Sequence, residues 1–213
     1  MTETLSQARS RVKRAPSPGA APPRFDAEML ALRSHLAPLL EARNPAVIAI
    51  TGCGPGEGVT TVARELSRVL ASEGLEVLLC GPLDVPQSPG RPKTLERKVM
   101  RTVVPSLSFT DISDLHVLKG DRRALVAFRT WVEAQKQNYA VVILDTPPIL
   151  ERGGWETLFR LEDGVLLVLE AERTRSAVLR ATVDAIAAAG GHVLGIVFNR
   201  RRRIIPDVVY QWL

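Results

Sequence analysis

The sequence has little that would stabilise a secreted or disulfide-bonded protein. Cys53 and Cys80 are the only cysteines among 213 residues, which is too few for a disulfide framework, so both are expected to be reduced and buried. No apolar run reaches the length of a membrane-spanning helix, and the first residues lack the apolar core of a signal peptide. These absences predict a cytoplasmic protein.

The charge is moderately basic, with 28 Lys and Arg against 23 Asp and Glu, a net charge of +5. Residues 1–24 are polar, basic and proline-containing, and they have too little apolar surface to order themselves. We therefore predict a disordered basic tail over 1–24 and one domain over 25–213, a length that suits a single α/β core. A solvated tail is the main interpretation, and contact with anionic lipid or an acidic partner is the alternative.

One stretch organises the rest of the chain. Ala46–Ile50 is a short apolar run typical of a buried strand, and four closely spaced glycines follow over Gly52–Gly58. Thr60 and Thr61 then open an amphipathic helix that ends near Gly74. A strand, a glycine loop and a helix N-terminus form the layout of a phosphate-binding loop, because main-chain amides and the helix dipole both favour an anion.

Strands and helices alternate along the remaining sequence. Helices are expected over 25–43, 121–137, 155–161 and 174–189, the last capped by Thr174, and strands over 75–79, 139–144, 164–169 and 192–198, with one or two more within 107–118. No regular structure is expected over 83–101, which is rich in Pro, Lys and Arg. The alternation predicts an α/β fold with a doubly wound, mostly parallel sheet in three α/β/α layers. The apolar strands Ala46–Ile50 and Val141–Leu144 should lie side by side at its centre.

Polar residues follow several of these strands. In doubly wound sheets ligands bind at the carboxyl ends of the strands, where we place Gly52–Thr60, Gly81–Asp84, Asp145 and Asn199. Asp145 ends an apolar strand and is suited to hold Mg²⁺ opposite the hydroxyl of Thr60. The simpler alternative is that Asp145 only caps the following turn.

Five segments together resemble the bacterial tyrosine kinases (BY-kinases) of capsule and exopolysaccharide systems. They are PGEGVTT, EVLL, YAVVILDTPP, DGVLLVLEAERT and HVLGIVFNR, within a likeness that runs from about Phe25 to the C-terminus. These kinases belong to the deviant-Walker P-loop group that includes MinD- and ParA-like ATPases. The resemblance implies a P-loop NTPase-like fold, Mg-ATP or Mg-ADP as ligand, and a place at the cytoplasmic face of the inner membrane. It also implies a membrane chain-length-determinant partner, a possible homo-oligomer, and no specific nucleic acid.

The resemblance implies a set of site residues. Nucleotide contacts fall on Gly54, Pro55, Gly56, Glu57, Gly58, Val59, Thr60, Thr61 and Asn199, with Asn199 at the adenine, and metal contacts on Thr60 and Asp145. Asp145 is the catalytic candidate if the protein is active. Tyr210 is the candidate phosphoacceptor, because family members phosphorylate a C-terminal tyrosine cluster.

The sequence departs from the family pattern at several of its charged positions. Val59 stands where the loop lysine is found, and Gly81 and Leu83 stand at the two acidic positions of the family's second motif. In the family's oligomerisation helix, Arg33 is retained while Ala27 and Leu30 replace its charged partners. These losses predict weak or absent nucleotide binding and little phosphoryl transfer.

Three functions follow from these observations. The first is a catalytically weak or inactive regulator of a membrane chain-length-determinant protein in exopolysaccharide or capsule biosynthesis and export, peripheral at the inner membrane. The second is an active ATP-dependent tyrosine autokinase in the same pathway, with Asp84 or a basic side chain supplying the missing contacts. The third is a MinD- or ParA-like positioning ATPase that uses the basic run Arg200–Arg203.

Overall fold

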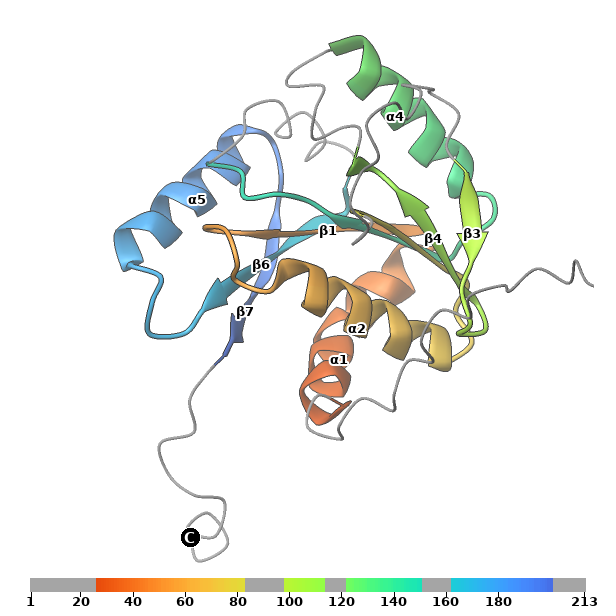
Figure 1. Ribbon diagram of the computed structural model, residues 1–213, viewed down its shortest axis with the longest axis horizontal. Helices are drawn as coiled ribbons and strands as arrows, with labels where there is room; N and C mark the ends of the chain where they lie inside the picture. Colours follow the sequence, from red (N-terminus) through yellow and green to blue (C-terminus); the bar gives the residue numbers. More distant parts are fainter. Residues whose placement is uncertain (1–25, 83–97, 114–121, 151–161, 201–213) are drawn as a thin grey trace, which may run out of the picture.

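The structure is a computed structural model that describes residues 26–82, 98–113, 122–150 and 162–200. These form one seven-stranded sheet with helices on both faces (Figure 1). The helices are α1 (Asp26–Ala42), α2 (Val59–Ser72), α4 (Arg122–Gln135) and α5 (Ser176–Ala188), and the strands are β1 (Ala46–Gly52), β2 (Val77–Gly81), β3 (Val99–Arg101), β4 (Leu107–Asp111), β5 (Val141–Asp145), β6 (Gly164–Glu170) and β7 (Val193–Asn199). Within the described ranges no helix has the length and apolarity needed to cross a bilayer.

The strand order is β3-β4-β2-β5-β1-β6-β7, and every neighbouring pair is parallel except β3 with β4. β1 and β5 pair at the centre, with Ala46 opposite Val141 and Ile50 opposite Asp145. Every residue of both strands is buried, as expected for parallel strands covered on both faces. The predicted fold class and the central pairing of these two strands are confirmed.

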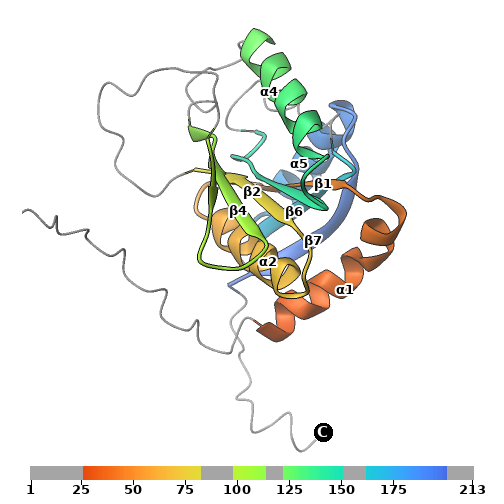
Figure 2. The ribbon, with the colours of Figure 1, turned by 90° about the vertical axis from the view of Figure 1, so that its right-hand side faces the viewer.

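Two apolar clusters lie on opposite faces of the sheet and make the three layers. On one face α1 and α2 bury Met29, Leu36 and Leu66 against strand residues such as Ile48 and Ile143. On the other face α4 and α5 supply the buried side chains Phe128, Val132 and Ile186. Figure 2 shows the same arrangement from the side, with α1 and α2 together below the strands and α4 and α5 above them.

Some local expectations need correction. Residues 83–101 were expected to lack regular structure, but β3 pairs with β4 in antiparallel orientation, with Val99 opposite Thr110. Three residues are too few to show an alternating pattern in the sequence, and this strand forms only because it pairs with β4. β2 also begins two residues later than expected, at Val77. The expected helix over 155–161, the expected strand LHVL at 115–118 and the tail 1–24 lie outside the described residues.

The retained arginine of α1 has a partner within the chain. Arg33 Nε donates to Glu73 Oε2 at 2.6 Å, and Glu73 follows the end of α2. The two helices therefore share an ion pair besides their apolar contact. Leu30, at another position of the family's oligomerisation motif, is 49% exposed.

Candidate functional site

The glycine loop connects β1 to α2 at the carboxyl edge of the sheet. β1 ends at Gly52 and α2 begins at Val59, with Gly58 as its N-cap at φ +91°. Only glycine adopts this left-handed conformation readily, and a Cβ at position 58 would also clash with Nδ2 of Asn199. The loop backbone is therefore fixed both by its own conformation and by the end of β7.

Asp145 lies beside the loop because the turn after β5 is bonded to β1. The amide and hydroxyl of Thr146 both donate to the carbonyl of Ile50, at 3.0 and 3.2 Å, and Thr51 Oγ1 donates to the carbonyl of Pro147 at 2.9 Å. Asp145 itself is only 4% exposed. These bonds hold the end of β5 against the strand that enters the loop, and the Thr146 hydroxyl is the side chain that this turn contributes to them.

Gly81 ends β2 directly alongside Asp145. A Cβ at position 81 would fall 3.2 Å from Cβ of Asp145 and 3.3 Å from its Oδ2. A side chain at position 81 would thus be tightly packed against Asp145, which would have to shift by a few tenths of an ångström to accept it. Gly81 leaves Asp145 as the acidic side chain at this point of the β2–β5 edge, within the part of the chain that the structure describes.

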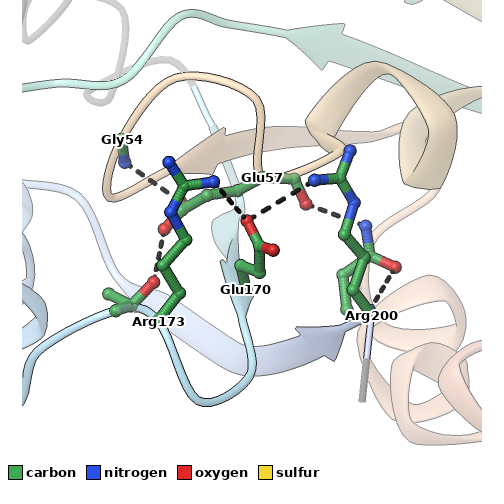
Figure 3. Close-up of polar contacts among 7 residues, drawn as sticks. Gly54, Glu57, Glu170, Arg173 and Arg200 are labelled. Carbon is green, nitrogen blue, oxygen red and sulfur yellow. Dashed lines mark hydrogen bonds and ion pairs between the residues drawn. The ribbon is translucent and has the colours of Figure 1, made fainter. Parts of the chain in front are cut away.

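Glu57 points back into its own loop. Its Oε2 accepts hydrogen bonds from the amides of Cys53, at 2.6 Å, and Gly54, at 3.0 Å. Its Oε1 accepts from Oγ1 of Thr174 at 2.5 Å (Figure 3). The residue is only 6% exposed, so this carboxylate is buried and held by three donors.

Asn199 and Glu170, at the ends of β7 and β6, complete the surroundings of the loop. Asn199 Nδ2 donates to the carbonyl of Glu57 at 2.8 Å, and its Oδ1 accepts from the amide of Arg200 at 2.9 Å. Glu170 Oε2 lies 3.1 Å from Arg173 and 3.5 Å from Arg200, so one carboxylate holds two arginines beside the loop (Figure 3). The loop is thus bonded through Glu57 to two strand ends, to Asn199 of β7 and to Thr174 just after β6.

Cys53 and Cys80 are free and buried, as predicted. Burial raises the pKa of the Cys53 thiol above its ordinary value; a hydrogen bond with Thr182 opposes this rise in pKa, and the negative charge of Glu57 adds to it. The thiol is therefore held in its neutral form. Val59 packs partly against the α1–α2 cluster, where it adds apolar surface instead of a positive charge.

The structure brings most of the predicted site residues to one edge of the sheet. The loop residues Gly54 to Thr61, Asp145 and Asn199 all lie at the carboxyl ends of β1, β5 and β7, whereas Tyr210 lies outside the described residues. Among the described residues no group of three His, Cys, Asp or Glu side chains gathers as a metal site. Asp145 with the hydroxyl of Thr60 fits Mg²⁺ only if nucleotide phosphates provide further ligands, which is the usual manner of Mg²⁺ binding.

Thr174 and Glu170 were missed from the sequence as site residues. Thr174 was expected to cap α5, but the N-cap is Arg175, which makes no side-chain capping bond, and the Thr174 hydroxyl binds Glu57 instead. A signal for both existed, because they lie at or just after the carboxyl end of β6, on the edge where the loop lies. Nothing in their spacing distinguishes that role from an ordinary turn.

No protein-family model matches the chain. It is 29% identical over 199 residues to EpsB of Ralstonia solanacearum, a protein provisionally named as a tyrosine-protein kinase. This match covers 82% of this chain and 26% of EpsB. It is 27% identical over 174 residues to the tyrosine-protein kinase YwqD of Bacillus subtilis, covering 73% of this chain and 72% of that one. The chain thus spans about a quarter of the length of the Ralstonia relative.

Solved structures share the fold. The kinase domain of the Escherichia coli tyrosine kinase ETK superposes with a TM-score of 0.65 at 18% identity, covering 93% of this chain and 88% of that one. At this identity the likeness concerns the fold alone. In sequence the chain is similar to proteins named as bacterial tyrosine kinases, and in fold it is similar to the kinase domain of ETK.

Proposed function

We propose that the chain is a nucleotide-binding domain of the BY-kinase type with little or no phosphoryl-transfer activity. In this proposal it acts in exopolysaccharide or capsule biosynthesis and export as a regulator of a membrane chain-length-determinant protein. The observation that supports it most is the pairing of a retained glycine loop with lost charges around it. Val59 provides no cation at the start of α2, and Gly81 provides no carboxylate at the end of β2 beside Asp145.

Binding depends on what the backbone still offers. The amides of Gly54–Thr61 would hold the phosphates at the start of α2, where the helix dipole favours an anion. Bound Mg²⁺ would neutralise phosphate charge, held by Asp145 and Thr60. Asp145 is kept in place for this by the bonds between the Thr146 turn and β1.

Catalysis has lost more than binding. One preorganised electrostatic contact to a transition state is worth about 10²–10³ in rate. A lysine and two acidic side chains are missing here, at Val59, Gly81 and Leu83. Even though such losses are not additive, we expect phosphoryl transfer to fall to a very low level.

The regulatory part of the proposal concerns the membrane. The basic residues of Met1–Arg24 and of Arg200–Arg203 would draw the protein to an anionic membrane surface beside its partner. Co-expression with the chain-length-determinant protein from the same gene cluster should move the chain into the membrane fraction. If the chain stays in the soluble fraction to the same extent with and without that partner, the regulatory role loses its main support.

The enzymatic part is tested with radiolabelled ATP. The purified chain, its Tyr210→Phe variant and an active bacterial tyrosine kinase as positive control are incubated with Mg²⁺ and γ-labelled ATP. We expect label on the positive control only. Label on the chain that disappears in Tyr210→Phe would show an active autokinase and contradict the proposal.

A further inference from the structure

The carboxylate of Glu57 occupies two main-chain amides of the glycine loop, those of Cys53 and Gly54, and the Gly54 amide is one of those assigned to phosphate in the proposed function. Glu57 is the only charged side chain between Thr51 and Thr61, and it turns inward to accept bonds from these two amides. A buried carboxylate needs such donors, because an unpaired buried charge is strongly unfavourable. Two of the loop amides therefore already bind an anion, and that anion is a side chain of the same protein.

We propose that Glu57 is an internal competitor for nucleotide phosphate at the loop. The same donor type, a main-chain amide, stabilises a carboxylate and a phosphate oxygen, and bonds to either are charge-assisted. A phosphate close to these amides has to displace the Glu57 carboxylate or sit beside its negative charge. No lysine at position 59 compensates for that charge, so the competition is stronger here than in a loop that carries the lysine.

Thr174 determines how firmly the competitor is held. Its hydroxyl donates to Glu57 Oε1 at 2.5 Å from the turn after β6, so the carboxylate is clamped between two segments (Figure 3). The backbone of Glu57 is held separately, by Asn199. Loss of the Thr174 hydroxyl should thus loosen the carboxylate while the loop backbone keeps its position.

A second explanation is that Glu57 only braces the loop in the shape that binds phosphate. The two explanations predict opposite effects of the same substitution. If Glu57 competes, its removal strengthens binding of a polyphosphate; if it braces, its removal weakens binding. The inference rests on the nucleotide-binding part of the proposed function, and the test separates the two.

The test is calorimetric titration of the full chain with Mg-ADP and, separately, with magnesium pyrophosphate. The variants are Glu57→Gln, which keeps the shape and removes the charge, Glu57→Ala, and Thr174→Val. The matched control is Glu65→Gln, which removes one negative charge from α2 at a residue that pairs with Arg68. Circular dichroism establishes that each variant is folded.

We expect both Glu57 variants to bind about ten- to a hundredfold more tightly than the native chain, the range that follows from freeing charge-assisted bonds. Thr174→Val should show a smaller gain in affinity, and Glu65→Gln should match the native chain. Equal or weaker binding by folded Glu57→Gln overturns the inference, as does failure of every variant to bind. If only the Glu57 variants bind nucleotide, the inference stands and nucleotide binding by the native chain is refuted. If the native chain binds nucleotide and Glu57→Gln binds it less tightly, native binding stands and the inference is refuted.

Discussion

The contact between Gly58 and Asn199 allows a quantitative test of how the loop is held. Gly58→Ala places a Cβ at φ +91° and against Nδ2 of Asn199. The left-handed conformation costs an L-residue about 1–2 kcal/mol, and displacing Asn199 from the carbonyl of Glu57 removes a hydrogen bond worth about 0.5–1.5 kcal/mol. We therefore expect Gly58→Ala to lower the free energy of unfolding by roughly 2–3 kcal/mol.

The chain provides a matched control for the backbone strain alone. Gly56 has φ +78°, and a Cβ there would meet no atom within 4 Å, so Gly56→Ala should show only the strain, about 1–2 kcal/mol. A second control is Gly58→Ala in an Asn199→Ala background, where the obstructing side chain is gone. There the substitution should again cost only the strain.

The measurement is urea unfolding at fixed pH, followed by far-UV circular dichroism and fitted with a common slope. The double-mutant cycle should give a coupling of about 1 kcal/mol between positions 58 and 199, which exceeds the usual error of additivity. Equal effects of Gly58→Ala in both backgrounds, or no difference between Gly58→Ala and Gly56→Ala, would refute the contact between the loop and β7.

Three further predictions follow from single sites. Val59→Lys should raise the affinity for Mg-ADP by about ten- to a hundredfold, through a charge-assisted bond to phosphate. Autophosphorylation should remain absent, because Gly81 and Leu83 still provide no carboxylate, and kinase activity in this variant would contradict the prediction. Among the residues that the structure describes, Glu162 has no hydrogen-bond partner for either side-chain oxygen, and burial raises its pKa well above the ordinary 4.5. The contribution of Glu162 to stability is complete at pH values below 4.5 and is lost as the pH rises through its pKa in the folded protein. Glu162→Gln should therefore flatten the pH dependence of the free energy of unfolding and stabilise the protein at higher pH. An unchanged pH profile would contradict this prediction. Asp163→Ala should destabilise by about 1–3 kcal/mol because Asp163 accepts from the amide of Val47 at 2.8 Å, whereas Arg43→Ala, which removes its exposed 3.7 Å ion pair, should change stability by less than about 0.5 kcal/mol in the same urea assay.

Much of the fold could be predicted because its central strands carry their own signal. Ala46–Ile50 and Val141–Leu144 are apolar on both faces, and this pattern indicated burial, adjacency and a parallel sheet. β3 could not be predicted, because three residues become a strand only when β4 pairs with them. Local pattern therefore predicts the elements that form by burial and misses those that form by pairing.

The sequence predicted where the site residues lie in the fold better than it predicted which partners their side chains bind. The carboxyl ends of parallel strands share one edge of the sheet, so the sequence alone was enough to place the loop, Asp145 and Asn199 together. The orientation of Glu57 could not be predicted, since its partner Thr174 lies 117 residues further along the chain. Thr174 had an adequate local explanation as a helix cap, and only the tertiary structure shows which partner its hydroxyl binds.

The most direct test of the central claim observes the loop amides themselves. On ¹⁵N-labelled native chain, addition of Mg-ADP to millimolar concentration should shift the amide resonances of Cys53, Gly54 and Gly56–Thr61 along one saturable binding curve. The Glu57→Gln variant should reach the same end point at lower nucleotide concentration. Unchanged loop resonances, or shifts confined to residues away from the carboxyl edge of the sheet, would contradict the account of this loop as a nucleotide site restrained by its own glutamate.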